Sequence, residues 1–268
     1  MSGFAPEWLA LREGADHRSI NHVVRRALLA HVSRLDVVRI ADLGCGTGSN
    51  FRSLAPEIAA KQAWQLIDHD PQLLQLASVM TADQARTSQA EVRVLETDLA
   101  TGNLDNIASQ VDLVTAAALF DLISADVIDK LVRSIAAAGC AFYTVLTYDG
   151  IATWLPETPI NATLREAFNR HQQTDKGFGP AAGPTATDVL ASAFAGQGYR
   201  VVRGKSPWIL DAGLSTLRHE TDRGWAGAVA ETDALTSEEC ATWLKEREAA
   251  PSAVTIVGHE DLLALPPA

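Results

Sequence analysis

Residues 37–50 read VVRIADLGCGTGSN, and this stretch decides the fold. A run of mostly β-branched residues ends in an acid, Asp42, and glycine then stands at every second position, 44, 46 and 48. Glycine has no Cβ, so such a turn bends sharply and lets a ligand lie against bare main chain. The pattern predicts a strand over 37–42, a ligand-binding loop, and a helix from Asn50 to Ala60.

The glycine spacing separates this loop from the dinucleotide fingerprint G-x-G-x-x-G, which needs glycine at position 49, where this chain has Ser. The spacing D-x-G-x-G-x-G resembles motif I of the class I S-adenosylmethionine (SAM) dependent methyltransferases. The resemblance covers about residues 36–150 and implies SAM as cofactor and methyl donor. It implies cofactor contacts from Asp42, Gly44, Cys45, Gly46, Gly48 and Asn50.

Strand and helix patterns alternate along the rest of the chain. Further strands are predicted at 63–68, 91–97, 111–116, 140–147, 199–203 and 253–257. Alternation of this kind predicts an α/β fold, a doubly wound and mostly parallel sheet with helices on both faces. The resemblance adds that the sheet is seven-stranded, with an antiparallel last strand. We expect the SAM-binding domain to span 36–268, behind an N-terminal helical cap at 1–35.

The composition and net charge of the chain indicate which classes of partner and which cellular compartment to expect. The 268 residues fit one α/β domain, and a net charge of −11 repels nucleic acid and anionic membranes. The three cysteines are far apart in the sequence, which favours a reducing cytoplasm over a disulfide framework. The N-terminus lacks the pattern of a secretory signal. We therefore expect a cytoplasmic protein with a small-molecule substrate, and leave its oligomeric state open.

A second acid stands at the end of the second predicted strand. Asp68 lies twenty positions after Gly48, where an acid can accept two hydrogen bonds from a ribose diol. Asp70 competes for this role. It directly precedes Pro71, however, and is typical of a helix N-cap, so we favour Asp68.

The resemblance also assigns the rest of the cofactor site. It implies that Asp98, at the end of the third strand, receives the adenine amine, with apolar contact from Leu99 and a place for His69 beside the ribose. After the fourth strand, the small residues Ala116 to Ala118 would let the cofactor approach, and Phe120 would line the methyl-transfer pocket. The alternative for Phe120 is simple core packing.

The segment 150–185 is rich in glycine and proline and follows the fifth strand, near the end of the sheet where ligands bind. We predict a lid-like insertion there; the alternative is a surface loop without a role. His171 is its candidate general base, and Arg170 and Lys176 are candidates for holding an acidic substrate. The alternative for all three is a solvated helix end, where the helix dipole favours basic side chains.

Other candidates lie outside this segment. Asp121 is a second candidate catalytic residue, and Tyr148 a candidate for substrate binding. In the N-terminal cap, Arg12, His17 and Arg18 could contribute to a lid, although a purely structural helix is the favoured reading. No metal site is expected, because the seven histidines neither pair at helical spacing nor cluster with cysteines.

Together these features predict a methyltransferase that moves a methyl group from SAM to O or N of a small molecule. A base is needed only if the acceptor must lose a proton of high pKa. Two alternatives remain. One is a protein of this fold that binds the cofactor without methyl transfer, or transfers an aminopropyl group. The other, less favoured, is an NAD(P)-dependent oxidoreductase.

Overall fold

The central sheet is built around the strand predicted at 37–42. In the computed structural model, which describes residues 4–102 and 104–267, this strand is β1 (Val37–Leu43). It pairs in parallel with β2 (Lys61–Asp68) on one side and β4 (Leu113–Ala117) on the other. Next to β2 lies β3 (Ala90–Glu96), and next to β4 lies β5 (Ala141–Leu155), both also parallel.

The last strand, β8 (Val254–Leu265), lies antiparallel between β5 and β6 (Arg200–Lys205), giving the order β3-β2-β1-β4-β5-β8-β6. The predicted doubly wound sheet with an antiparallel last strand is thus confirmed. The sheet has eight strands rather than seven, because the short β7 (Trp208–Leu210) also pairs with β8. The prediction ended the last strand at 257 because the polar sequence GHED at 258–261 interrupts its apolar pattern.

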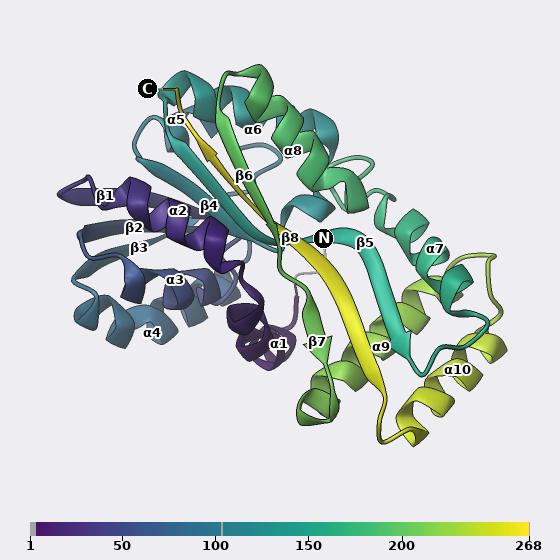
Figure 1. Cartoon of the computed structure of the whole chain (residues 1–268). Coiled ribbons are helices and arrows are strands. Elements are labelled where there is room, and N and C mark those ends of the chain that lie inside the picture. Colours follow the sequence, from purple (N-terminus) through teal and green to yellow (C-terminus); the bar gives the residue numbers. More distant parts are fainter. Residues whose placement is uncertain (1–3, 103, 268) are drawn as a thin grey trace.

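Helices cover both faces of this sheet, as predicted (Figure 1). One face carries α2 (His22–Val32), α3 (Ser49–Leu54) and α4 (Pro71–Thr87), and the other carries α5 (Leu104–Ala108), α6 (Ala125–Ala138) and α8 (Ala186–Gly196). The helix expected to run to Ala60 ends at Leu54 and continues as a 3-10 turn, η1 (Ala55–Glu57), which contains Pro56. Proline lacks the N–H that would extend the helix.

The N-terminal cap consists of two helices, α1 (Pro6–Ser19) and α2. Asn21 separates them: its side chain accepts hydrogen bonds from the N–H groups of Val23 at 3.0 Å and Val24 at 3.2 Å. Its Nδ2 donates to the carbonyl of Lys205 at 2.9 Å. The bend between the helices is therefore fixed to the sheet and sends α1 across the ends of the strands.

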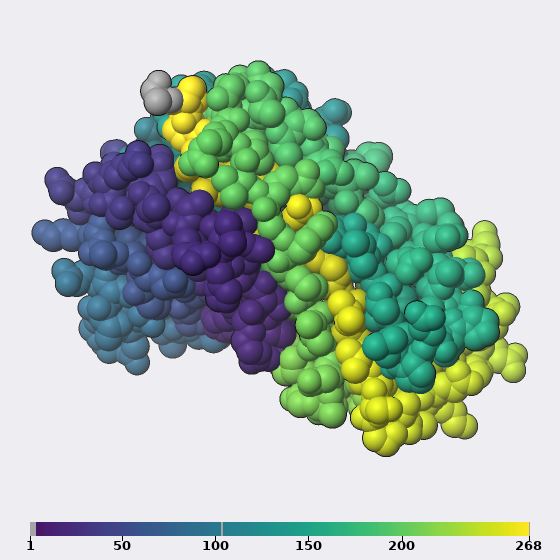
Figure 2. All heavy atoms as spheres, viewed as in Figure 1, coloured from purple at the N-terminus to yellow at the C-terminus, as the bar shows by residue number. Residues whose placement is uncertain are grey.

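A second lobe projects from the ends of β5 and β8 (Figures 1 and 2). Beyond a bulge after Tyr148, β5 continues to Leu155 in antiparallel pairing with β8. The helices of this lobe are α7 (Asn161–Gln172), α9 (Ser215–Ala230) and α10 (Ser237–Ala249). Its core is aromatic: Phe168 stacks on Trp225 with ring centroids 3.6 Å apart, and Trp154 packs edge-on against Trp225 and Trp243. The segment 150–185 contributes α7 and the end of β5 to this lobe.

Side-chain caps fix the starts of α4 and α6, one helix on each face of the sheet. Asp70 accepts from the N–H groups of Gln72 and Leu73, which places it at the start of α4 as predicted. Ser124 accepts from the N–H of Val127 at the start of α6.

Over the described residues, no helix has the length and apolar character that crossing a bilayer requires.

Replacing Ser124 with Ala should lower the free energy of unfolding by about 1 kcal/mol, because the N–H of Val127 loses its acceptor. Urea denaturation would measure the change. Ser192→Ala, at an exposed position within α8, is the matched control and should cause no loss of stability. Equal effects of the two substitutions would contradict the capping role.

Candidate active site

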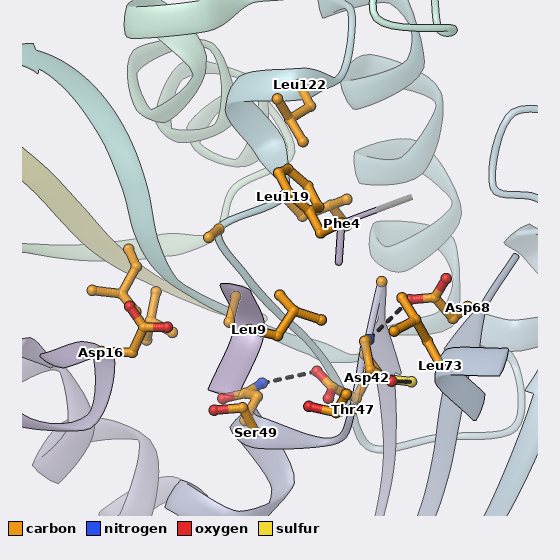
Figure 3. A pocket seen from close by; sticks show the side chains of 18 of the residues that line it. Phe4, Leu9, Asp16, Asp42, Thr47, Ser49, Asp68, Leu73, Leu119 and Leu122 are labelled. Atoms are coloured by element: carbon orange, nitrogen blue, oxygen red, sulfur yellow. Dashed lines mark hydrogen bonds between the residues drawn. The ribbon is translucent and has the colours of Figure 1, made fainter. Parts of the chain in front are cut away.

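A cavity of about 220 Å³ opens at the carboxyl ends of the parallel strands. Ligands of doubly wound sheets bind at this end. The structure brings together in its wall most of the predicted cofactor contacts: Asp42, Gly44, Cys45, Gly46, Asn50, Asp68, His69, Asp98 and Leu99. In Figure 3, Asp42 and Asp68 lie at one side of the cavity, and Leu119 and Leu122 lie at another.

The glycine loop forms the floor in a conformation that few other residues adopt. Gly44, Gly46 and Gly48 have φ angles of 61°, 53° and 82°, in the left-handed region. Gly48 does not line the cavity. A Cβ there would lie 2.6 Å from Cγ2 of Thr81, so this glycine allows close packing of the loop against α4.

Asp68 holds the loop from the end of β2. Its carboxylate accepts from the N–H of Gly46 at 2.9 Å and from the N–H of Asp70 at 3.1 Å. The ring nitrogen Nδ1 of His69 lies 3.2 Å from Asp68 Oδ1. Asp68 lines the cavity, whereas Asp70 is turned to its capping role on α4. The geometry therefore places Asp68 at the ligand and Asp70 at the helix.

Asp42, at the end of β1, is fully buried and only half satisfied. Its Oδ1 accepts from Nδ2 of Asn50 at 2.8 Å, but its Oδ2 has no hydrogen-bond partner among the described residues. Burial raises the pKa of Asp42 to about 7; the Asn50 hydrogen bond opposes this and the nearby Asp68 adds to it. A buried carboxylate oxygen without a donor is costly, so this one is suited to a donor on a ligand.

The end of β4 contributes to the wall through two of the three alanines named by the resemblance and through the leucine that follows them. Ala117, Ala118 and Leu119 line the cavity, whereas Ala116 is buried within the sheet. Phe120 is also fully buried and packs against Phe142, with ring centroids 5.3 Å apart. Core packing, the alternative considered for Phe120, is what the structure shows.

On the β3 side, Asp98 and Leu99 both line the cavity. Asp98 is exposed, and its Oδ1 accepts from the N–H of Ala100 at 2.8 Å. Leu99 is buried. The carboxylate of Asp98 is thus oriented by the N–H of Ala100 in the loop after β3, and its Oδ2 accepts no hydrogen bond from the described residues.

The first helix forms the roof. Arg52 of α3 donates to Glu13 at 2.8 and 2.6 Å, and His17 Nε2 lies 3.0 Å from Ser49 Oγ. These contacts fix α1 over the glycine loop, where Leu9 approaches Gly46. Figure 3 shows Leu9 among the side chains that line the cavity. The sequence had left Arg12 and His17 as weak candidates, and both line the cavity. Lining residues that it had not singled out as site candidates include Phe4, Leu9, Asp16, Ile20, Leu122, Val145 and Leu146.

The predicted substrate residues of the insertion do not line the cavity. His171 on α7 pairs with Glu231 at 3.2 Å, and Arg170 is exposed on the same helix. Lys176 is half-buried beside Gly177, which does line the cavity. Tyr148 donates to Oδ1 of Asn169 at 2.7 Å and belongs to the aromatic core of the second lobe.

Asp121 lies in the 3-10 turn η2 (Phe120–Leu122), next to the lining residue Leu122, but it is not itself among the residues that line the cavity. It is 9% exposed, and its Oδ1 has no hydrogen-bond partner among the described residues. Burial raises the pKa of Asp121 to about 6.

In the part of the chain that the structure describes, no three His, Cys, Asp or Glu side chains are grouped to hold a metal ion.

Comparison with known proteins agrees with this geometry. Residues 40–138 match the family model described as a methyltransferase domain. Among solved structures, the YcgJ protein from Bacillus subtilis is 10% identical with a TM-score of 0.52, and the match covers 92% of this chain and 100% of that one. That likeness shows the fold.

Two further structures are SAM-dependent methyltransferases in complex with S-adenosylhomocysteine (SAH). The one from Geobacter sulfurreducens is 18% identical with a TM-score of 0.47, and covers 99% of this chain and 100% of its own. The one from Thiobacillus denitrificans is 15% identical with a TM-score of 0.45, and covers 97% and 98%. Among curated proteins, none matches this sequence.

Proposed function

We propose that the chain, whose residues 40–138 match a methyltransferase domain, transfers the methyl group of SAM to a small-molecule acceptor. The observation that carries the proposal is the free Oδ2 of the buried Asp42. SAM carries an ammonium group that can donate to it. When bound, SAM supplies a methyl group on a positively charged sulfur.

The three acids fit the rest of SAM. Asp42 and Asp68 lie at the ends of the adjacent strands β1 and β2, and Asp98 follows the next strand, β3. Neighbouring strands lie about 4.8 Å apart, so these acids span about 10 Å. An extended ligand with an ammonium group at one end, a ribose diol in the middle and an adenine amine at the other end matches that row. The diphosphate of a dinucleotide would be repelled by it.

The shape of the cavity supports a small acceptor. The roof formed by α1 leaves about 220 Å³, and the wall beyond Asp42 is largely apolar, with Leu119, Leu122 and Val145. The net charge of −11 disfavours nucleic acid as the acceptor. The three cysteines are free and buried, which suits the reducing cytoplasm proposed for this protein.

Calorimetric titration with SAM and with SAH tests the proposal directly. We expect one site per chain for each ligand, in the micromolar range. NAD is the control ligand and should not bind. Binding of NAD instead of SAM would overturn the proposal in favour of an oxidoreductase, and absence of binding by SAM and SAH would remove it.

SAM affinity should depend on pH through Asp42. Because burial raises the pKa of this group to about 7 in the free protein, its ionisation costs stability as pH rises towards 7. An ammonium group stabilises the ionised form, so binding should be about fivefold weaker at pH 6 than at pH 7, a range in which the α-ammonium group of SAM itself stays largely protonated. Calorimetry at the two pH values would measure this. Asp42→Asn should bind SAM more weakly and without this dependence; an equal slope in the variant would contradict the role of Asp42.

A further inference from the structure

The last strand, β8, carries a polar sequence in the middle of the sheet. Residues 258–261 read GHED, and Asp261 among them is fully buried. It lies between β5 and β6, opposite Gly204 on β6. A buried carboxylate is costly unless its oxygens accept hydrogen bonds. The groups that donate to Asp261 therefore indicate its role.

One oxygen of Asp261 holds a strained segment of the cavity wall. Its Oδ1 accepts from the N–H of Leu146 at 2.8 Å. The pairing of β5 with β8 is interrupted here by a bulge, because Val145 and Leu146 together lie opposite Asp261. Leu146 has a φ angle of 59°, in the left-handed region that a bulky side chain rarely adopts. Both residues of the bulge line the cavity, so the hydrogen bond to Asp261 stabilises the shape of the wall.

The bulge also contacts the neighbouring strand, β4. The carbonyl of Val145 accepts from the N–H of Ala118 at 2.9 Å, and Ala118 has a φ angle of 49° and lines the cavity as well. Among the described residues, Gln89 is the only other non-glycine residue with a positive φ angle. Strained backbone gathered at one wall of a cavity is typical of a functional site, and the surrounding structure must hold it.

The other oxygen of Asp261 holds the end of the roof. Its Oδ2 accepts from the N–H of Asn21 at 2.7 Å. This N–H belongs to the peptide bond between Asn21 and Ile20, which lies at the end of α1 and lines the cavity. A Cβ on Gly204 would lie 2.4 Å from Cγ of Asn21, so this glycine makes room for the contact. The wall and the roof are thus bound to different oxygens of one carboxylate.

We propose that Asp261 is a positioning residue of the proposed active site, which fixes the wall at Leu146 relative to the roof at Ile20. It thereby sets the shape of the apolar end of the cavity. Asp261 acts through these two residues, since it is not among the described residues that line the cavity. That a ligand occupies the cavity rests on the proposed function, whereas the two hydrogen bonds do not.

An amide in place of the carboxylate can keep only one of the two backbone contacts, because it has one acceptor oxygen. Ser206, whose Oγ donates to Oδ1 at 2.5 Å, decides which contact is kept. A hydroxyl group can also accept, so in Asp261→Asn the amide NH₂ should turn towards Ser206 and the amide oxygen towards Asn21. The N–H of Leu146 should then lose its acceptor while the roof stays in place. Asp261→Ala removes both contacts.

Hydrogen exchange of the two amides, followed by NMR, tests this order of effects. In Asp261→Asn the N–H of Leu146 should exchange at least about tenfold faster than in the unmodified protein, and that of Asn21 at an unchanged rate. In Asp261→Ala both should exchange faster. SAH should also dissociate from Asp261→Ala at least about tenfold faster, because α1 lies over the glycine loop. Stopped-flow measurement gives this rate.

Unchanged exchange of both amides in Asp261→Asn would overturn the proposal, and so would release of SAH from Asp261→Ala at the unmodified rate. If Asp261→Ala does not fold, the exchange of the two amides in Asp261→Asn decides by itself.

Gln62→Ala is the matched control for a general loss of stability. Gln62 is 2% exposed, and its Nε2 donates to the carbonyls of Ala55, Ile58 and Ser88 at 2.9, 3.1 and 3.3 Å. It lies near the start of β2, whereas the cavity lies at the end of that strand. This variant should be less stable and should release SAH at the unmodified rate. Release as fast as from Asp261→Ala would refute the positioning role, because any loss of stability would then loosen the roof.

SAH binding distinguishes this inference from the proposed function. If the unmodified protein does not bind SAH, the proposed function is wrong, and the exchange of the two amides still tests the role of Asp261. If SAH binds and leaves Asp261→Ala no faster, the positioning role is wrong and the proposed methyltransferase stands.

Discussion

Replacing Asp68 with Ala should weaken SAM binding at least about 100-fold, because two kinds of interaction are lost together. The carboxylate holds the N–H of Gly46 at 2.9 Å and so fixes the glycine loop. In the proposed complex it also accepts hydrogen bonds from the ribose diol. Hydrogen bonds to charged groups contribute about 1.5–3 kcal/mol each, and about 1.4 kcal/mol corresponds to a tenfold change in affinity. Calorimetric titration of the variant would measure the loss.

Asp70→Ala is the matched control, two residues away. It removes the acceptor for Gln72 and Leu73 at the start of α4, and should cost about 1 kcal/mol of stability. SAM affinity should stay within about threefold of that of the unmodified protein, because the Asp70 side chain is directed to the helix. If the two substitutions weakened binding equally, Asp68 would act only through the loop and the assignment of the ribose contact would be wrong.

The part of the site that could be predicted from sequence is the part made by local structure. A β-branched run, an acid and alternating glycines specify β1 and its loop within fourteen residues, 37–50. The Asp70-Pro71 pair likewise identifies the start of α4. Each of these signals depends on neighbours in the chain, so no knowledge of distant contacts is needed.

The ends of the strands could not be predicted from the local sequence, because they are set by contacts with residues far away in the chain. The sequence Asp149-Gly150 is typical of a turn, yet β5 passes through it as a bulge. Asp149 is satisfied there by the N–H of Ile151 and by Lys205, the latter 56 residues away in the chain. At the other end, Asp112 was expected within β4 but binds Arg39, and the strand starts at Leu113.

The roof and the second lobe carried no such local signal. Helix α1 is only weakly amphipathic in sequence, and its position over the loop is set by the pair Glu13–Arg52 and by His17 with Ser49. His171 was proposed as a base because it is the only histidine of the insertion. Its orientation follows from the packing of α7 on α9, which turns it to Glu231. Packing between residues far apart in the sequence therefore decides both the position of α1 and the orientation of His171.

Arg247 on α10 is expected to be the most important single side chain for the stability of the second lobe. It is buried and donates from Nε to Asp222 at 3.1 Å, from Nη1 to the carbonyl of Leu155 at 2.7 Å, and from Nη2 to the carbonyl of Val254 at 3.0 Å. Asp222 also accepts from Thr255 at 2.6 Å. Through this one side chain, α9 and α10 are joined to the ends of β5 and β8.

Arg247→Ala should therefore lower the free energy of unfolding by about 3–5 kcal/mol, since the buried Asp222 would keep only the more distant cation of Arg218, at 3.9 Å, and would lose its hydrogen bond from Arg247. Urea denaturation, followed by tryptophan fluorescence of the lobe, would measure the loss. Arg223→Ala, which removes an exposed pair with Glu248 on the same two helices, should leave the unfolding midpoint nearly unchanged. Replacing all three charged side chains, with Arg247→Met, Asp222→Leu and Arg218→Met together, should recover much of the loss, because the cost arises from the unpaired charge rather than from the missing attraction. A triple variant as unstable as Arg247→Ala would show instead that the bonds from Arg247 to the two strand carbonyls hold the lobe in place.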